Sequence, residues 1–112
     1  MQIIHEREGT NLVVYLVDEL DQHSARTVID ALDRIVTLYP EESIILDLSR
    51  LTFMDSSGLA VAVNLYRSLE HSGRTLTIRH TPPQAMRVFH AAHLERKIQF
   101  IDQVGEGAVC RS

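Results

Sequence analysis

The chain has few of the features that mark secreted or membrane proteins. Its one cysteine, Cys110, cannot form a disulfide within the chain, which fits a reducing cytoplasm. No apolar run approaches the roughly 20 residues needed to cross a bilayer. Residues 1–8 also lack the basic start and apolar centre of a signal peptide. We therefore expect a cytoplasmic protein.

Positive charge is scarce as well. Eleven Lys and Arg residues against 15 Asp and Glu residues give a net charge of −4 with the histidines neutral. Phosphate backbones attract basic patches, so this balance argues against nucleic acid as the direct ligand. A glycine-rich phosphate-binding loop is also absent, so we expect no cofactor, and nucleotide would enter only through a partner. If the protein regulates transcription, it should do so through another protein.

The pattern of apolar residues predicts one α/β domain over residues 1–104 and a flexible tail over 105–112. The 112 residues are enough for one core, and 45 % hydrophobic with 23 % charged residues is typical of a globular protein. Period-two and period-3.6 patterns alternate along the chain, which favours a mixed sheet of four or five strands packed against helices. The expected strands are Gln2–Glu8, 12–17, 43–48, 75–79 and Gln99–Ile101, and the expected helices are 25–39, 57–72 and a third that starts at Thr81-Pro82-Pro83.

Local signals fix several of the expected ends. Residues 8–11 have the composition of a hairpin turn. Asp21 or Ser24 is a suitable N-cap for the first helix, and Gly73 should end the second in the left-handed conformation. The third helix should bury Met86, Phe89 and Ala92.

The most informative segment is 46–59, Leu-Asp-Leu-Ser-Arg-Leu-Thr-Phe-Met-Asp-Ser-Ser-Gly-Leu. It predicts a buried strand, a short polar turn and a helix start at which Asp55, Ser56 and Ser57 lie together. Unpaired N–H groups and a partial positive charge at a helix start make a suitable place for a phosphate. A serine there is therefore a candidate phosphorylation switch, although a serine at a helix start is more often only a cap.

Segment 53–59 resembles the phosphorylation segment of the bacterial anti-sigma-factor antagonists, which are STAS-domain proteins. The resemblance extends to Glu19-Leu20-Asp21 and to Thr81-Pro82 with the helix that follows, and so covers nearly the whole chain. It implies a STAS-type domain of the sporulation or general-stress partner-switching type. In that family the first serine of the pair is phosphorylated, which corresponds to Ser56.

The resemblance implies a non-enzymatic function. The unphosphorylated form would bind an anti-sigma factor that is also a serine kinase of the GHKL type, and so release the sigma factor. Phosphorylation of Ser56 would end that binding, and a serine phosphatase would restore it. The implied partner surface contains Asp21, Asp55, Ser56, Ser57 and Gly58.

Each of these residues also has a plainer interpretation. We expect Ser57 to cap the second helix and Ser56 to project into solvent. Asp55 can serve in recognition or only bond to backbone N–H groups of the turn. Asp21 can be a partner contact, or only an N-cap or a turn carboxylate. Gly58 permits close approach of a partner backbone or of a neighbouring strand.

Three departures from the family pattern stand out. Asp18, Ala60 and His93 occupy positions where glycine is common in the family. None of them touches Ser56, but Asp18 can alter the partner surface near Asp21. The departures leave the subfamily open.

Other uses of these residues fit less well. Ser56-Ser57-Gly58 resembles half of a hydrolase nucleophile elbow, but Met54 replaces its first glycine and no His–carboxylate pair is evident. His90 and His93 are spaced to share a helical face, yet no third ligand for a metal follows from the spacing, so no metal site is expected. The main alternative is a non-switching STAS scaffold bound to another ATPase, such as that of a lipid-transport complex.

Overall fold

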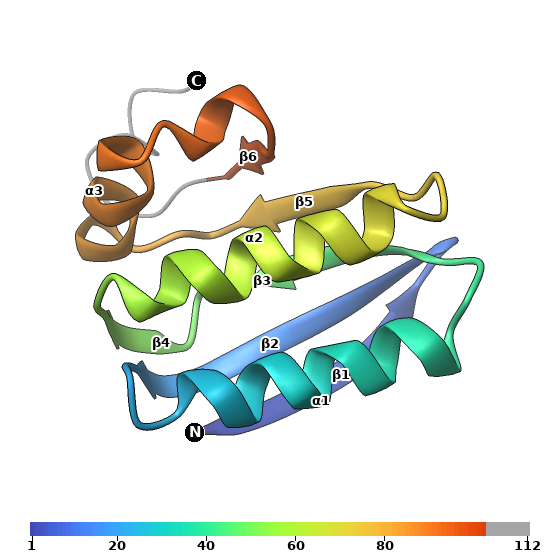
Figure 1. Ribbon diagram of the computed structural model, residues 1–112, viewed down its shortest axis with the longest axis horizontal. Coiled ribbons are helices and arrows are strands. Elements are labelled where there is room, and N and C mark those ends of the chain that lie inside the picture. Colours follow the sequence, from blue (N-terminus) through green and yellow to red (C-terminus); the bar gives the residue numbers. More distant parts are fainter. Residues whose placement is uncertain (103–112) are drawn as a thin grey trace.

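A mixed sheet with helices on one face makes up the fold of residues 1–102, which are the residues that the computed structural model describes (Figure 1). The α/β class expected from the sequence is confirmed. The expected tail, 105–112, lies outside the described residues. The strands are β1 (Gln2–Glu8), β2 (Asn11–Leu20), β3 (Ser43–Asp47), β4 (Leu51–Met54), β5 (Leu76–Arg79) and β6 (Gln99–Ile101), and the helices are α1 (Ala25–Leu38), α2 (Ser57–Glu70), α3 (Pro83–Ala91) and the 3-10 turn η1 (Leu94–Arg96).

The first two strands form the expected antiparallel hairpin. Glu8 pairs with Asn11, so Gly9 and Thr10 make a two-residue loop in which Gly9 has a φ of 65°. Two-residue hairpin loops need positive φ, and glycine adopts it without a steric penalty. The hairpin turn expected at residues 8–11 is therefore confirmed.

β2 is longer than predicted and pairs with a strand that the sequence did not predict. Its first half pairs in parallel with β3, and after an irregularity between Asp18 and Glu19 its end pairs in parallel with β4. Asp18 has a φ of 82°, and its N–H donates to the carbonyl of Arg50 at 3.1 Å. This bend turns the end of β2 toward segment 51–54, which we had interpreted as part of a polar turn.

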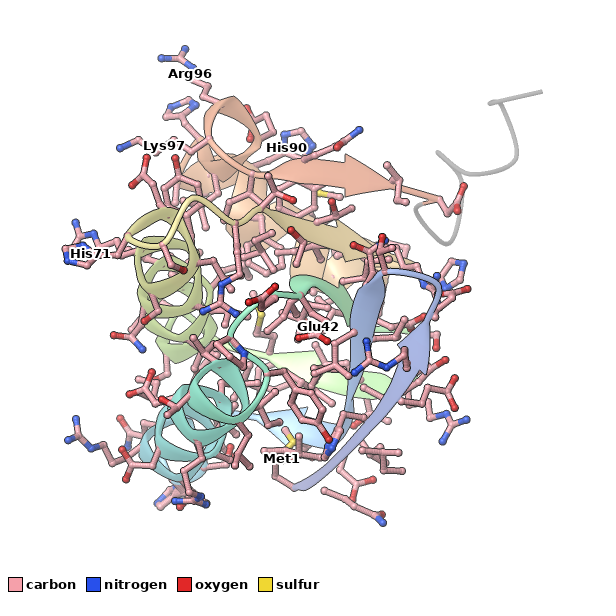
Figure 2. The ribbon with its side chains drawn as sticks, turned by 90° about the vertical axis from the view of Figure 1, so that its right-hand side faces the viewer. Met1, Glu42, His71, His90, Arg96 and Lys97 are labelled. Carbon is pink, nitrogen blue, oxygen red and sulfur yellow. The ribbon has the colours of Figure 1, made fainter. Side chains whose placement is uncertain are left out.

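The remaining strands extend the sheet in the order β1-β2-β3-β5-β6, and every pairing after the hairpin is parallel. Helices α1 and α2 lie side by side on one face of the sheet, and α3 lies beyond β5 (Figure 1). Figure 2 shows the two layers edge-on, with α1 and α2 on one side of the strands. Side chains buried between the layers include Leu12, Val14, Leu16, Val28, Leu32, Ile44, Leu46, Val61, Leu65 and Ile78.

The helix ends agree with the sequence prediction within two residues. α2 ends at Glu70 rather than at 72, and Gly73 has the expected left-handed conformation with a φ of 75°. The N–H of Arg74 reaches back to the carbonyl of Leu69 at 2.9 Å, the pattern that commonly closes a helix around such a glycine.

The buried face of α3 was only partly predicted. Phe89 is buried as expected, but Ala85 is buried beside it, Met86 is half-buried and Ala92 is exposed. Ala92 lies just past the end of the helix, so the helical period does not carry it to the sheet. Within residues 1–102, no helix is long and apolar enough to cross a bilayer.

Candidate functional site

The turn between β4 and α2 is held by Asp55 rather than by either serine. The Asp55 N–H donates to the carbonyl of Leu20 on β2 at 3.1 Å, and the Asp55 Oδ1 accepts the Ser57 N–H at 2.8 Å. Neither serine makes a side-chain cap, so the expectation that Ser57 caps the helix is wrong. The Asp55 carboxylate, one residue before the pair, accepts the N–H of Ser57, and neither serine hydroxyl takes part in holding the turn.

Ser56 occupies the N-cap position of α2, and its side chain is exposed, as expected. The backbone around Ser56 offers an anion fewer unpaired N–H groups than a helix end without such bonds would. The Gly58 N–H donates to the Asp55 carbonyl at 3.0 Å and the Leu59 N–H donates to the Ser56 carbonyl at 3.1 Å. Together with the Ser57 N–H, these groups are the amides that we expected to be unpaired, so that expectation is wrong.

Gly58 lies where the start of α2 meets the end of β4. A Cβ on Gly58 would overlap the Cγ and Sδ atoms of Met54, a residue with 0 % exposure. The glycine therefore permits close approach of a neighbouring strand, which is one of the two explanations that the sequence left open. The turn between β4 and α2 is therefore packed directly onto the core.

Asp21 lies at the same edge of the sheet as this turn. It follows Leu20, which pairs with Met54, so the end of β2 runs beside the end of β4. Its Oδ1 accepts the N–H groups of His23 at 3.0 Å and of Ser24 at 3.2 Å, and its own N–H donates to the Ser24 Oγ at 3.1 Å. Asp21 therefore orders the turn that leads into α1 as a turn carboxylate, and the N-cap of that helix is Ser24, the other candidate from the sequence.

The charge of Asp21 is stabilised by these contacts. Partial burial alone would raise the pKa of Asp21, but the backbone N–H groups of Ser24 and His23 outweigh burial, so the pKa lies below its usual value. The carboxylate lines a shallow depression whose other members are Met1, Asp18, Glu19, His23, Ser24 and Thr52. Three acidic side chains thus surround this depression beside the candidate switch.

Two contacts near the site escaped the sequence analysis because they join residues far apart in the chain. The first is made by the side-chain amide of Gln84 on α3, which bonds to both the N–H and the carbonyl of Met54. The second is an ion cluster on buried Asp47, whose Oδ2 lies 2.8 Å from Arg79 Nε and 3.0 Å from His80 Nδ1. Asp47 and His80 form the His–carboxylate pair that the sequence did not reveal.

The Asp47–His80 pair has no bond to a serine in the part of the chain that the structure describes: among the hydrogen bonds of residues 1–102, none joins His80 to a serine hydroxyl. Instead Asp47 links the ends of β3 and β5 through Arg79, which also reaches Glu8 on β1 at 3.0 Å. The cluster ties together strands on the sheet.

The histidines do not gather around a metal. No group of three or more His, Cys, Asp or Glu side chains within residues 1–102 is placed to hold an ion, and Cys110 lies outside that range. His93 does not share a helical face with His90, because His93 lies after α3 with a φ of 59°. Figure 2 shows His71 pointing away from the end of α2, and both His71 and His90 are exposed.

Comparison with known proteins agrees with this fold. Residues 2–107 match the family described as STAS domain. The chain belongs to the STAS-domain family. This match confirms the family membership that segment 53–59 predicted.

The chain is similar to several named proteins over nearly its whole length. The chain is 30% identical over 102 residues to an anti-sigma F factor antagonist of Paenibacillus polymyxa, with 91% of this chain and 87% of the relative covered. It is 29% identical over 105 residues to an anti-sigma-B factor antagonist of Listeria monocytogenes, with 92% of this chain and 90% of the relative covered. Among solved structures, the anti-sigma factor antagonist SpoIIAA in its unphosphorylated form has a TM-score of 0.70 and 24% identity over 96% of this chain and 94% of that one.

Proposed function

We propose that this STAS domain is an anti-sigma-factor antagonist that is switched off by phosphorylation of Ser56. In its unphosphorylated form it binds an anti-sigma factor that is also a serine kinase of the GHKL type, and the sigma factor is released. A serine phosphatase restores the binding form. The proposal transfers to this chain the function named for two relatives that are 30% and 29% identical to it over nine-tenths of its length.

The observation that carries the proposal is the state of Ser56. Its hydroxyl is exposed at the start of α2, makes no cap bond, and follows a turn held by Asp55. A kinase can therefore reach this hydroxyl without breaking a contact within the domain. The partner surface that we propose contains Asp21, Asp55, Ser56, Ser57 and Gly58.

Electrostatics explains how one phosphate would end binding. Phosphorylation adds a charge of about −1.5 to −2 at neutral pH. The nearby amides of Ser57 and Gly58 already donate to Asp55, so the phosphate would gain few backbone donors and would lie beside an existing carboxylate. Burying such a group at an interface costs several kcal/mol, on the order of a hundredfold or more in affinity. Binding can thus be lost without refolding.

The test is phosphopeptide mapping after incubation with ATP and a GHKL serine kinase from the same genome. The wild type is compared with Ser56→Ala, and Ser57→Ala is the matched control one residue away. We expect phosphate on Ser56 in the wild type and in Ser57→Ala, with loss of anti-sigma binding as phosphate accumulates. If no such kinase modifies the wild type and a lipid-transport ATPase co-purifies instead, the scaffold function replaces this proposal.

A further inference from the structure

The backbone of Met54 is held by a side chain from another part of the chain. The Met54 N–H donates to Gln84 Oε1 at 2.9 Å, and Gln84 Nε2 donates to the Met54 carbonyl at 2.8 Å. One carboxamide therefore satisfies both backbone groups of a single residue, as a neighbouring strand would do. Met54 lies two positions before the proposed phosphorylation site.

Strand geometry explains why this edge needs a partner. Backbone groups of successive residues in a strand point alternately to its two sides, and the Asp55 N–H points toward β2, where it meets the Leu20 carbonyl. The N–H and carbonyl of Met54 consequently point the other way, away from β2. Unpaired backbone groups at a partly buried position are costly, and Gln84 removes that cost.

The side chain of Met54 is fixed as firmly as its backbone. It has 0 % exposure and fills the space left by the missing Cβ of Gly58 at the start of α2. Gln84 itself is half-buried in the first turn of α3, the helix that packs against β4. Met54 is thus held between α3, β2 and α2 immediately before the chain turns into Asp55 and Ser56.

We propose that Gln84 is a positioning residue that sets the place of Ser56 for its kinase and for the anti-sigma partner. This inference rests on the proposed function. Reactions between two proteins are sensitive to placement, since a displacement of about 1 Å can cost on the order of a hundredfold in rate. Loss of the two bonds would let the end of β4 move away from α3 and carry the serine with it.

Two variants separate the two bonds. Gln84→Met has a similar length and removes both of them. Gln84→Glu keeps an acceptor for the Met54 N–H but removes the donor to the Met54 carbonyl. Two controls accompany them: Arg87→Met changes an exposed side chain one turn along α3, and Val36→Ala lowers stability from a buried position on α1.

The first measurement is amide hydrogen exchange in the free protein. In Gln84→Met we expect the amides of Met54 and Asp55, both hydrogen-bonded in the wild type, to exchange about tenfold faster or more, with no change at Leu65 in the middle of α2. In Gln84→Glu the Met54 amide should stay within about threefold of the wild type, because its acceptor remains. Unchanged exchange at Met54 in Gln84→Met would overturn the inference.

The second measurement is the steady-state kinetics of Ser56 phosphorylation at a temperature where every variant is fully folded. We expect Gln84→Met to lower kcat/KM by about tenfold or more, whereas Arg87→Met and Val36→Ala stay near the wild type. Faster exchange with wild-type kinetics would show that Gln84 has only a structural role. If the kinase does not modify the wild-type protein, the proposed function fails first, and the inference about Ser56 falls with it.

Discussion

Replacing Gly58 with alanine is the sharpest test of the packing under the turn between β4 and α2. The change adds one methyl group at the start of α2, where Gly58 has ordinary helical geometry rather than a left-handed conformation. Helix propensity alone favours the change, since alanine is better than glycine by up to about 1 kcal/mol inside a helix. Any loss of stability must therefore come from contact with the rest of the protein.

The structure supplies that contact. The new Cβ would overlap the Cγ and Sδ of Met54, which is fully buried and cannot swing into solvent. Inserting a methyl group into a well-packed core costs about 1–3 kcal/mol. When the gain in helix propensity is subtracted from this packing cost, we expect the free energy of unfolding to fall by about 1 kcal/mol and the melting temperature by about 4–6 °C.

The assay is urea unfolding combined with a double-mutant cycle. In the Met54→Ala background the methyl group enters vacated space, so there Gly58→Ala should be neutral or stabilising, with a coupling of about 1–2 kcal/mol between the two sites. Gly73→Ala is the control. A Cβ at Gly73 would meet no atom within 4 Å, so the loss of stability there comes from the φ of 75° alone, and Met54→Ala should not relieve it. A single Gly58→Ala variant as stable as the wild type would refute the argument.

Three further perturbations have defined outcomes. Arg74→Met removes hydrogen bonds of 2.7 and 3.2 Å to the carbonyls of Tyr39 and Glu42 after α1, and should lower the free energy of unfolding by about 2 kcal/mol in urea titrations. Asp18→Gly removes the backbone strain of a non-glycine residue with a φ of 82°. It should raise the urea midpoint by an amount that corresponds to about 0.5 kcal/mol in the free energy of unfolding. Burial alone would raise the pKa of Asp47, but hydrogen bonds from Arg79 and other neighbours hold it below its usual value of about 4. The stability due to this carboxylate is therefore present above about pH 4 and lost as the pH falls further. When the free energy of unfolding is measured from pH 3 to 7, its fall at the acid end should be smaller in Asp47→Asn than in the wild type.

Elements with a regular local pattern were predictable from the sequence. Gly9 marked the hairpin, the helical period marked α1, and Gly73 marked the end of α2, because each signal acts over a few neighbouring residues. β4 was not predictable in this way. It has only four residues, and its pairing depends on the bend at Asp18, so a local pattern carries almost no information about it.

The candidate site shows the same division. Exposure of Ser56 and a turn held by polar side chains followed from residue types, but which side chain holds the turn did not. Aspartate and serine can both accept a backbone N–H at a helix start, and only the path of the chain out of β4 brings the Asp55 carboxylate to the Ser57 N–H. The bond between Gln84 and Met54 spans 30 positions and leaves no local signature.

The family departures have a conformational explanation that composition does not reveal. Asp18 and His93, two of the residues that depart from the pattern expected for the family, have φ values of 82° and 59°. Glycine adopts such angles freely, and aspartate and histidine are among the residues that tolerate them best. Both departures therefore keep the backbone that glycine would adopt.

Asp18 differs from His93 in where its side chain lies. It adds a carboxylate to the depression that also contains Glu19 and Asp21, beside the turn that carries Ser56. This chain thus accepts backbone strain at a position where glycine would remove it, and gains negative charge at the edge of the proposed partner surface. A partner fitted to this domain should then present positive charge opposite Asp18, and its affinity should fall more steeply with salt for the wild type than for Asp18→Gly.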